Sequence, residues 1–206
     1  MTSFPYGLHC GDCQHILPRL PPACLRACIT HPPYWQGHGD GEIGGEASHA
    51  TYCLTLAYIF RHVRRVLQPS GDLWLILDDP FPVLDVLTDQ GWSVVGMWPW
   101  DTDQIVYLQQ AGSASMPPVD PVWEMPRQDP DDPIISLAQY ATVPSSLIQR
   151  CMLHSTVEGE GILDPFAGSG TTGVVAQRLR RPFIGIEYHP IAACVAAARL
   201  RYAQTL

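Results

Sequence analysis

The segment that decides the fold runs from Gly161 to Glu187 and reads GILDPFAGSGTTGVVAQRLRRPFIGIE. Residues 162–163 are apolar and predict a short buried strand. A turn follows in which Gly168 and Gly170 let the backbone bend sharply and approach a ligand closely. The apolar positions after the turn have helical spacing, and residues 183–186 predict the next buried strand. The segment therefore predicts one half of a doubly wound α/β sheet.

Polar groups at the turn and at the end of the second strand suit a nucleoside. Thr171 and Thr172 place hydroxyls at the start of the helix, where free N–H groups point outward. Glu187 ends the second strand, where an acid accepts hydrogen bonds from the two hydroxyls of a ribose. The third glycine of a dinucleotide fingerprint is absent, and a phosphate-loop lysine is excluded because the chain has no lysine. The ligand therefore need not carry a phosphate.

The length of 206 residues predicts one domain, residues 1–206, with a single core. No apolar run reaches the ~20 residues that a membrane span needs, and the N-terminus lacks the features of a signal peptide. We therefore expect a cytoplasmic protein without a membrane partner. The net charge of −8 argues against a broad, nonspecific nucleic-acid surface.

The seven cysteines predict free thiols more than disulfides in such a chain. The spacing of Cys10, Cys13, Cys24 and Cys28 admits a zinc site. Cys28, however, lies in an apparent strand, where cysteine is an ordinary small core residue. We therefore predict no metal.

Alternating strands and helices predict a three-layer α/β/α sandwich. Strands are expected at residues 6–10, 25–30, 73–77, 93–98, 105–109, 162–163 and 183–186. Helices are expected at residues 14–20, 50–67, 81–90, 144–154, 174–180 and 190–202. Residues 36–49 predict a glycine-rich loop, residues 69–71 a turn, and the proline-rich residues 111–135 an irregular crossover.

A second motif, Thr-His-Pro-Pro-Tyr-Trp at residues 30–35, follows the predicted strand 25–30. Its two prolines exclude a helix and fix an extended, rigid turn. Together with Asp-Pro-Phe-Ala-Gly-Ser-Gly-Thr-Thr at residues 164–172, it resembles the motif pair of the amino-methylating DNA methyltransferases. The resemblance covers nearly the whole chain. The order, with the Pro-Pro-Tyr motif first, is similar to the permuted class called beta.

The resemblance implies a Rossmann-like fold, S-adenosyl-L-methionine as cofactor, and DNA with a flipped base as substrate. It implies that a catalytic turn is formed by His31, Pro32, Pro33 and Tyr34. It implies that Asp12 holds the adenine edge of the cofactor. The other cofactor-binding residues it implies are Asp164, Phe166, Ala167, Gly168, Ser169, Gly170, Thr171, Thr172 and Glu187.

The chemistry explains the catalytic turn. The lone pair of an exocyclic base amine is conjugated with the ring, so the amine is a poor nucleophile. By analogy with the family, the Pro32 carbonyl and the side chain before it accept hydrogen bonds from the amine and free its lone pair. Tyr34 stacks on the base, which is out of reach inside a duplex.

Two departures from the family pattern leave alternatives open. His31 stands where the family has Asp, Asn or Ser, and only a neutral imidazole accepts a hydrogen bond. Residues 99–142 form a reduced target-recognition region, since only Pro99–Gln104 joins the two strands there. We expect methyl transfer to cytosine N4 ahead of adenine N6. A weak or inactive relative that binds cofactor or a partner, and an RNA amine methyltransferase, are the alternatives.

The small recognition region raises the question of what contacts DNA. A homodimer or a separate recognition subunit would supply the missing contacts. Two arginine clusters are candidates for phosphate contacts, or are solvated helix ends. They are Arg61, Arg64 and Arg65, and Arg178, Arg180 and Arg181.

Overall fold

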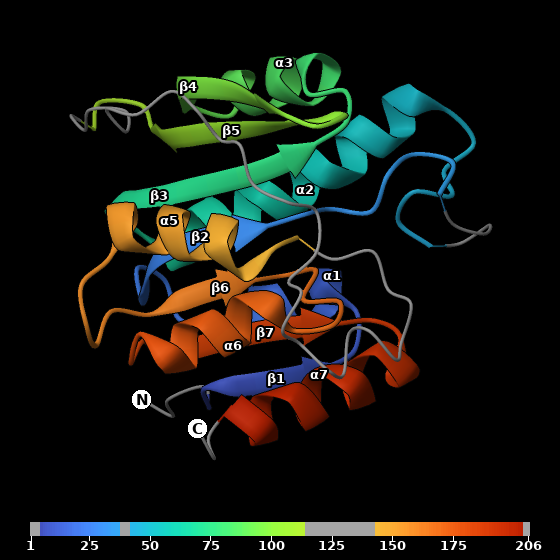
Figure 1. Ribbon diagram of the computed structural model, residues 1–206. Coiled ribbons are helices and arrows are strands. Elements are labelled where there is room, and N and C mark those ends of the chain that lie inside the picture. Colours follow the sequence, from blue (N-terminus) through green and yellow to red (C-terminus); the bar gives the residue numbers. More distant parts are fainter. Residues whose placement is uncertain (1–4, 38–41, 114–142, 204–206) are drawn as a thin grey trace.

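A computed structural model describes residues 5–37, 42–113 and 143–203 of the chain. Seven strands form one mixed sheet, and helices lie against it (Figure 1). The strands are β1 (Gly7–Cys10), β2 (Leu25–Thr30), β3 (Leu67–Leu77), β4 (Trp92–Trp100), β5 (Asp103–Gln110), β6 (Ile162–Asp164) and β7 (Phe183–Glu187). The helices are α1 (Cys13–Ile16), the 3-10 helix η1 (Leu17–Arg19), α2 (His49–Val66), α3 (Phe81–Asp89), α5 (Ser145–Ser155), α6 (Thr171–Arg178) and α7 (Pro190–Ala203).

The strand order is β1-β7-β6-β2-β3-β5-β4. In this order, β1, β7, β6, β2 and β3 run parallel to one another, whereas β5 runs antiparallel to both β3 and β4. The carboxyl ends of β1, β7, β6 and β2 therefore meet at one edge of the sheet. That edge brings together Cys10, Glu187, Asp164 and Thr30, which are far apart in the sequence.

Two apolar layers cover the sheet, one on each face. Side chains of a strand alternate between faces, so Leu73, Leu75 and Leu77 of β3 pack with α2 and α3. Trp74 and Ile76 point the other way, toward α5, α6 and α7. The strand is buried on both faces, as its continuous apolar run predicts. The three-layer α/β/α sandwich is confirmed (Figure 1).

Every predicted strand and helix has a counterpart among the described residues, but two helices change in extent and one predicted turn is wrong. Residues 14–20 divide into α1 and η1, and α6 occupies residues 171–178 instead of 174–180. The turn predicted at residues 69–71 is wrong, because β3 already starts at Leu67. Leu67 pairs with Leu25 and Asp72 with Ala27, so the residues between them bulge out within the strand. Most of the predicted crossover, residues 114–135, lies outside the described residues.

All seven cysteines have free thiols, and Cys28 is fully buried in β2 as expected of a core residue. Within residues 5–37, 42–113 and 143–203, no group of three or more His, Cys, Asp or Glu side chains is arranged to hold a metal ion. No helix in these ranges is long and apolar enough to cross a membrane.

Candidate active site

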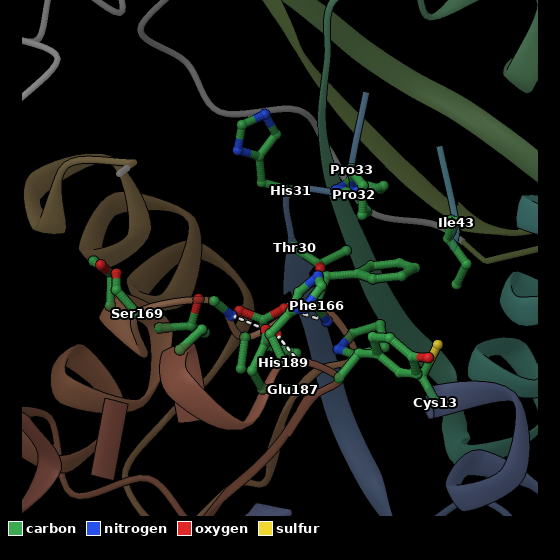
Figure 2. A pocket seen from close by; sticks show the side chains of 18 of the residues that line it. Cys13, Thr30, His31, Pro32, Pro33, Ile43, Phe166, Ser169, Glu187 and His189 are labelled. Atoms are coloured by element: carbon green, nitrogen blue, oxygen red, sulfur yellow. Dashed lines mark hydrogen bonds between the residues drawn. The ribbon is translucent and has the colours of Figure 1, made fainter. Parts of the chain in front are cut away.

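A cavity of about 420 Å³ opens at the edge where the parallel strands end. This volume lies within the range of small-molecule sites. Thirteen of the fourteen site residues nominated from the sequence line it, and the exception is Gly170. Figure 2 shows His31, Pro32 and Pro33 on one side of the cavity and Glu187 and Ser169 on the other, with Thr30 and Phe166 between them. The two motifs, whose first residues Thr30 and Asp164 are 134 positions apart in the sequence, thus share one cavity.

Glu187 at the end of β7 organises the glycine-rich turn. Its Oε2 accepts a hydrogen bond from the Gly168 N–H at 2.7 Å, and its Oε1 accepts one from the His189 N–H at 2.7 Å. Each carboxylate oxygen has a second lone pair, so the group can still accept from a ligand that enters the cavity. The carboxylate is therefore preorganised for two neighbouring hydroxyl donors.

Asp164 at the end of β6 joins the two motifs directly. Its Oδ1 accepts from the Thr30 hydroxyl at 2.6 Å and from the Phe166 N–H at 3.1 Å, and the Thr172 side chain also hydrogen-bonds to the carboxylate. Burial raises the pKa of Asp164 to about 6, against the lowering effect of these donors. Thr30 was not nominated as a site residue, although its place at a strand end beside the Pro-Pro-Tyr motif was a signal.

The raised pKa of Asp164 predicts a pH-dependent stability. Between about pH 4 and pH 6 the folded state binds a proton at Asp164 that the unfolded chain has released, so stability falls as the pH rises through this window. Asp164→Asn has no carboxyl group to titrate at this position. Its free energy of unfolding should therefore lack this decrease of about 2 kcal/mol. Urea unfolding of both proteins at pH 4.5 and pH 7 measures it. Parallel pH profiles in the two proteins would contradict the assignment.

Two tyrosine hydroxyls fix the catalytic turn, one from α2 and one from the turn itself. The Tyr52 hydroxyl, from α2, donates to the Pro33 carbonyl at 2.9 Å. The Tyr34 hydroxyl donates to both oxygens of Asp103 in β5, at 3.1 and 3.0 Å. Burial raises the pKa of Asp103, while the Tyr34 hydrogen bond lowers it. The His31 ring lies edge-on to Tyr34, with 5.0 Å between ring centroids.

The Pro32 carbonyl differs from that of Pro33. Among the described residues, none donates a hydrogen bond to the Pro32 carbonyl, whereas the Pro33 carbonyl is engaged by Tyr52. Pro32 itself is buried and lines the cavity. A rigid carbonyl of this kind can accept a hydrogen bond from a group inside the cavity. Neither Tyr52 nor Asp103 carried a sequence signal, because both come from elements distant in the chain.

The remaining wall is formed near α1 and by the loop after the catalytic turn. Asp12 caps α1, since its Oδ1 accepts from the Gln14 N–H at 2.8 Å, and it lines the cavity with the buried Cys13. Ile43 and Phe166 also line the cavity, and Glu42 reaches across to His189, with 3.5 Å between Oε2 and Nε2. Figure 2 shows Cys13, Ile43 and Phe166 around the apolar side of the cavity. The Phe166 ring and the Asp12 carboxylate suit this wall to a flat ligand ring that has a hydrogen-bond donor at its edge.

The two glycines of the turn have different surroundings and therefore different structural roles. Gly168 has a φ of +52°, and a Cβ built there would meet no atom nearer than the Phe166 carbonyl oxygen at 4.0 Å. Gly170 has a φ of +82°, and a Cβ there would lie 2.9 Å from the Ala196 Cβ of α7. Gly170 does not line the cavity, and the space that its missing side chain leaves is on the side of α7. Gly170 lets α7 pack against the turn.

This difference predicts opposite outcomes for two alanine substitutions. Gly168→Ala should keep the fold, with a cost of about 1 kcal/mol for the backbone conformation, and lower cofactor affinity at least ~10-fold by filling the cavity. Gly170→Ala should lower the free energy of unfolding by about 3 kcal/mol, because backbone conformation and overpacking add. Urea unfolding and calorimetric titration separate the two effects. Equal losses of stability in both variants would contradict the assignment.

Comparison with known proteins identifies the family. The sequence pattern of the N6/N4 family described as DNA methylase matches residues 90–197, just over half of the chain. The chain belongs to this DNA methylase family. The DNA methylase is 27% identical to the type II methyltransferase M.Cfr9I of Citrobacter freundii, over 93% of this chain and 86% of that protein. It is 29% identical to M.XycI of Xanthomonas campestris pv. cyanopsidis, again over 93% and 86%.

Solved structures agree in fold. The cytosine-N4-specific PvuII DNA methyltransferase superposes with a TM-score of 0.79 at 19% identity, covering 96% of this chain and 87% of that one. A DNA modification methylase assigned as putative from Thermus thermophilus, complexed with S-adenosyl-L-methionine, superposes with a TM-score of 0.70 at 21% identity, covering 97% and 94%. The DNA methylase described here therefore has the Rossmann-like fold of this enzyme class.

Proposed function

We propose that this DNA methylase transfers a methyl group from S-adenosyl-L-methionine to the exocyclic amine of a flipped base, with cytosine N4 preferred over adenine N6. One observation carries the proposal: the Pro-Pro-Tyr turn and the glycine-rich turn line a single cavity. Membership of the N6/N4 family supports the reaction class. The preference for cytosine rests on the likeness to the cytosine-N4-specific PvuII enzyme. It also rests on Trp35, because the family resemblance implies that a tryptophan after this motif is frequent in cytosine enzymes.

The residues present fit the cofactor. Glu187 offers carboxylate oxygens to ribose hydroxyls, Asp12 and Phe166 lie where the adenine edge and face would be held, and Gly168 leaves open space beside the turn. Ser169, Thr171 and Thr172 add hydroxyls at the start of α6. S-adenosyl-L-methionine supplies the sulfonium methyl group when bound. The binding roles of these residues are part of the proposal.

The catalytic turn acts on the base. The Pro32 carbonyl accepts one hydrogen bond from the target amine, and His31 accepts a second when its imidazole is neutral. These bonds draw the amine nitrogen out of conjugation and aim its lone pair into the cavity. Tyr34, held by Asp103, offers its ring face to the flipped base. Positioning supplies much of the rate, and no covalent enzyme intermediate is required.

The product identifies the reaction. Bacterial DNA incubated with the protein and S-adenosyl-L-methionine is digested to nucleosides and examined by mass spectrometry for N4-methylcytosine and N6-methyladenine. We expect N4-methylcytosine from the unsubstituted protein and none from Tyr34→Ala. N6-methyladenine alone would reverse the base preference. Methylation of RNA but not DNA, or cofactor binding without any transfer, would favour one of the two alternatives.

This chain is shorter than the relative M.Cfr9I over the region in which the two align. The alignment with M.Cfr9I extends over 261 positions but includes only 93% of the 206 residues of this chain, so the relative has segments that this chain lacks. We propose that residues 1–206 form one methyltransferase domain, in the permuted order of the beta class, with a reduced recognition region at about residues 99–142. A homodimer or a recognition subunit then supplies DNA contacts.

Some arginines of the two clusters are engaged within the fold. Arg65 donates to the Leu17 carbonyl at 2.9 Å, and Arg181 donates to the Thr156 carbonyl at 2.8 Å. Arg61 lies over the Tyr58 ring, and Arg180 lies 3.5 Å from Glu158. Half-buried Arg64 packs beside Gly91. At least two of the six arginines thus serve the fold itself.

We therefore predict weak DNA binding by the isolated chain. The net charge of −8 and the short connection Pro99–Gln104 should give micromolar or weaker affinity with a shallow dependence on salt. Fluorescence anisotropy at several salt concentrations, combined with sedimentation to determine the oligomeric state, measures this. Nanomolar, sequence-specific binding by a monomer would contradict the prediction.

A further inference from the structure

Arg199 is a buried arginine beside the glycine-rich turn. It lies on α7, and only 1% of its surface is exposed. Its Nη1 donates to the Ser169 carbonyl at 2.6 Å, to the Ser169 Oγ at 3.0 Å and to the Thr171 Oγ1 at 3.1 Å. A buried guanidinium costs free energy unless its donors are satisfied, so this placement needs a reason beyond packing. The sequence offered little signal for it, because Arg199 follows a run of alanines.

The contacts with Arg199 leave the Ser169 and Thr171 hydroxyls free to act as hydrogen-bond donors. Each hydroxyl has one proton to donate, and both hydroxyl oxygens already accept from Arg199. Ser169 and Thr171 are almost fully buried, at 8% and 7% exposure, and both line the cavity. Over the described part of the chain, neither hydroxyl has an acceptor for its own proton. Both protons are therefore left for an acceptor inside the cavity.

We propose that Arg199 is a positioning residue that makes Ser169 and Thr171 hydrogen-bond donors for the carboxylate of the methionine moiety of the cofactor. This inference rests on the proposed function, because it assumes that S-adenosyl-L-methionine occupies the cavity. It goes beyond that function by assigning selectivity for a carboxylate to a side chain that does not itself line the cavity. A hydroxyl that accepts from a cation is also polarised, which strengthens its own donation.

The electrostatics point in the same direction. The guanidinium lies at the start of α6, where the helix dipole also places positive charge. Both attract a carboxylate and repel the sulfonium group of the ligand. The carboxylate end of the ligand is therefore favoured beside Ser169 and Thr171. This leaves the sulfonium end for the part of the cavity nearer the catalytic turn.

The test compares two ligands that differ only in this carboxylate. Calorimetry measures the affinities of S-adenosyl-L-methionine and of its decarboxylated form for the unsubstituted protein and for Arg199→Met. Since hydrogen bonds to a charged group are stronger than those between neutral groups, we expect the affinity ratio of the two ligands to fall ~10-fold or more. Arg201→Met is the matched control, because Arg201 is an exposed arginine on the same helix. Its ratio should not change.

A second pair of variants covers the case in which Arg199→Met does not fold. Ser169→Ala/Thr171→Val removes the two hydroxyls and should reduce the same ratio, and adding Arg199→Lys to it should reduce the ratio no further. An unchanged ratio in Arg199→Met or in the hydroxyl variant, or equal losses for both ligands, overturns the inference. If the unsubstituted protein binds neither ligand, the proposed function itself fails.

Discussion

Glu187→Ala is expected to lower the affinity for S-adenosyl-L-methionine by roughly 100-fold or more, because it removes the charged acceptor for two ribose hydroxyls. The same substitution leaves the N–H groups of Gly168 and His189 without their acceptor, so the free energy of unfolding should also fall by about 1–3 kcal/mol. Calorimetric titration with the unreactive product S-adenosylhomocysteine, beside urea unfolding, measures both effects.

A milder variant separates the ribose contact from the support of the turn. Glu187→Gln keeps the size of the side chain but has one acceptor oxygen. The unsubstituted protein should discriminate against the 2′-deoxy analogue of S-adenosylhomocysteine, and Glu187→Gln should lose most of that discrimination. Glu158→Ala is the control, because Glu158 is an exposed glutamate paired with Arg180. Undiminished affinity in Glu187→Ala would remove Glu187 from the cofactor site.

The second large effect concerns His31. His31→Ala should lower the single-turnover rate of methyl transfer by roughly 10²-fold while leaving cofactor affinity nearly intact, because one acceptor for the target amine is lost. His31→Ser and His31→Asp restore an acceptor of the family type and should preserve or raise the rate. His154→Ala is the control, since His154 is exposed on α5 and does not line the cavity.

The dependence on pH gives a second readout for the same residue. Only a neutral imidazole accepts a hydrogen bond, so acidification should slow the unsubstituted enzyme more than His31→Ser. Burial raises the pKa of Asp164 to about 6, so this group also titrates on acidification. Its effect on the rate should be the same in both proteins and is therefore removed when their rates are compared as a ratio. If His31→Ala transfers methyl as fast as the parent, the Pro32 carbonyl and Tyr34 must suffice. An inactive parent with an active His31→Ser variant would indicate a disabled methyltransferase.

The sequence could predict the elements that local patterns encode. The continuous apolar run at Leu73–Leu77 predicts a strand buried on both faces, and it is one. The motif at residues 164–172 predicts a strand, a turn and a helix in that order, and the structure has them. Both depend on neighbouring residues, whose spacing and backbone preferences are visible in the chain. The turn predicted at residues 69–71 failed because strand pairing with Leu25 overrode a local Pro-Ser-Gly signal.

Contacts between distant segments were decided only by the tertiary structure. The sequence alone determined the two motifs and, through their resemblance to a family, thirteen of the residues that line the cavity. It could not show that Thr30 donates to Asp164, that Asp103 holds Tyr34, or that Arg199 reaches Ser169 and Thr171. Nor could it separate Gly168, which leaves room for a ligand, from Gly170, which leaves room for α7. The physical reason is that the order of the parallel strands and the packing of the helices bring these groups together. Neither the strand order nor the helix packing can be inferred from the spacing of neighbouring residues.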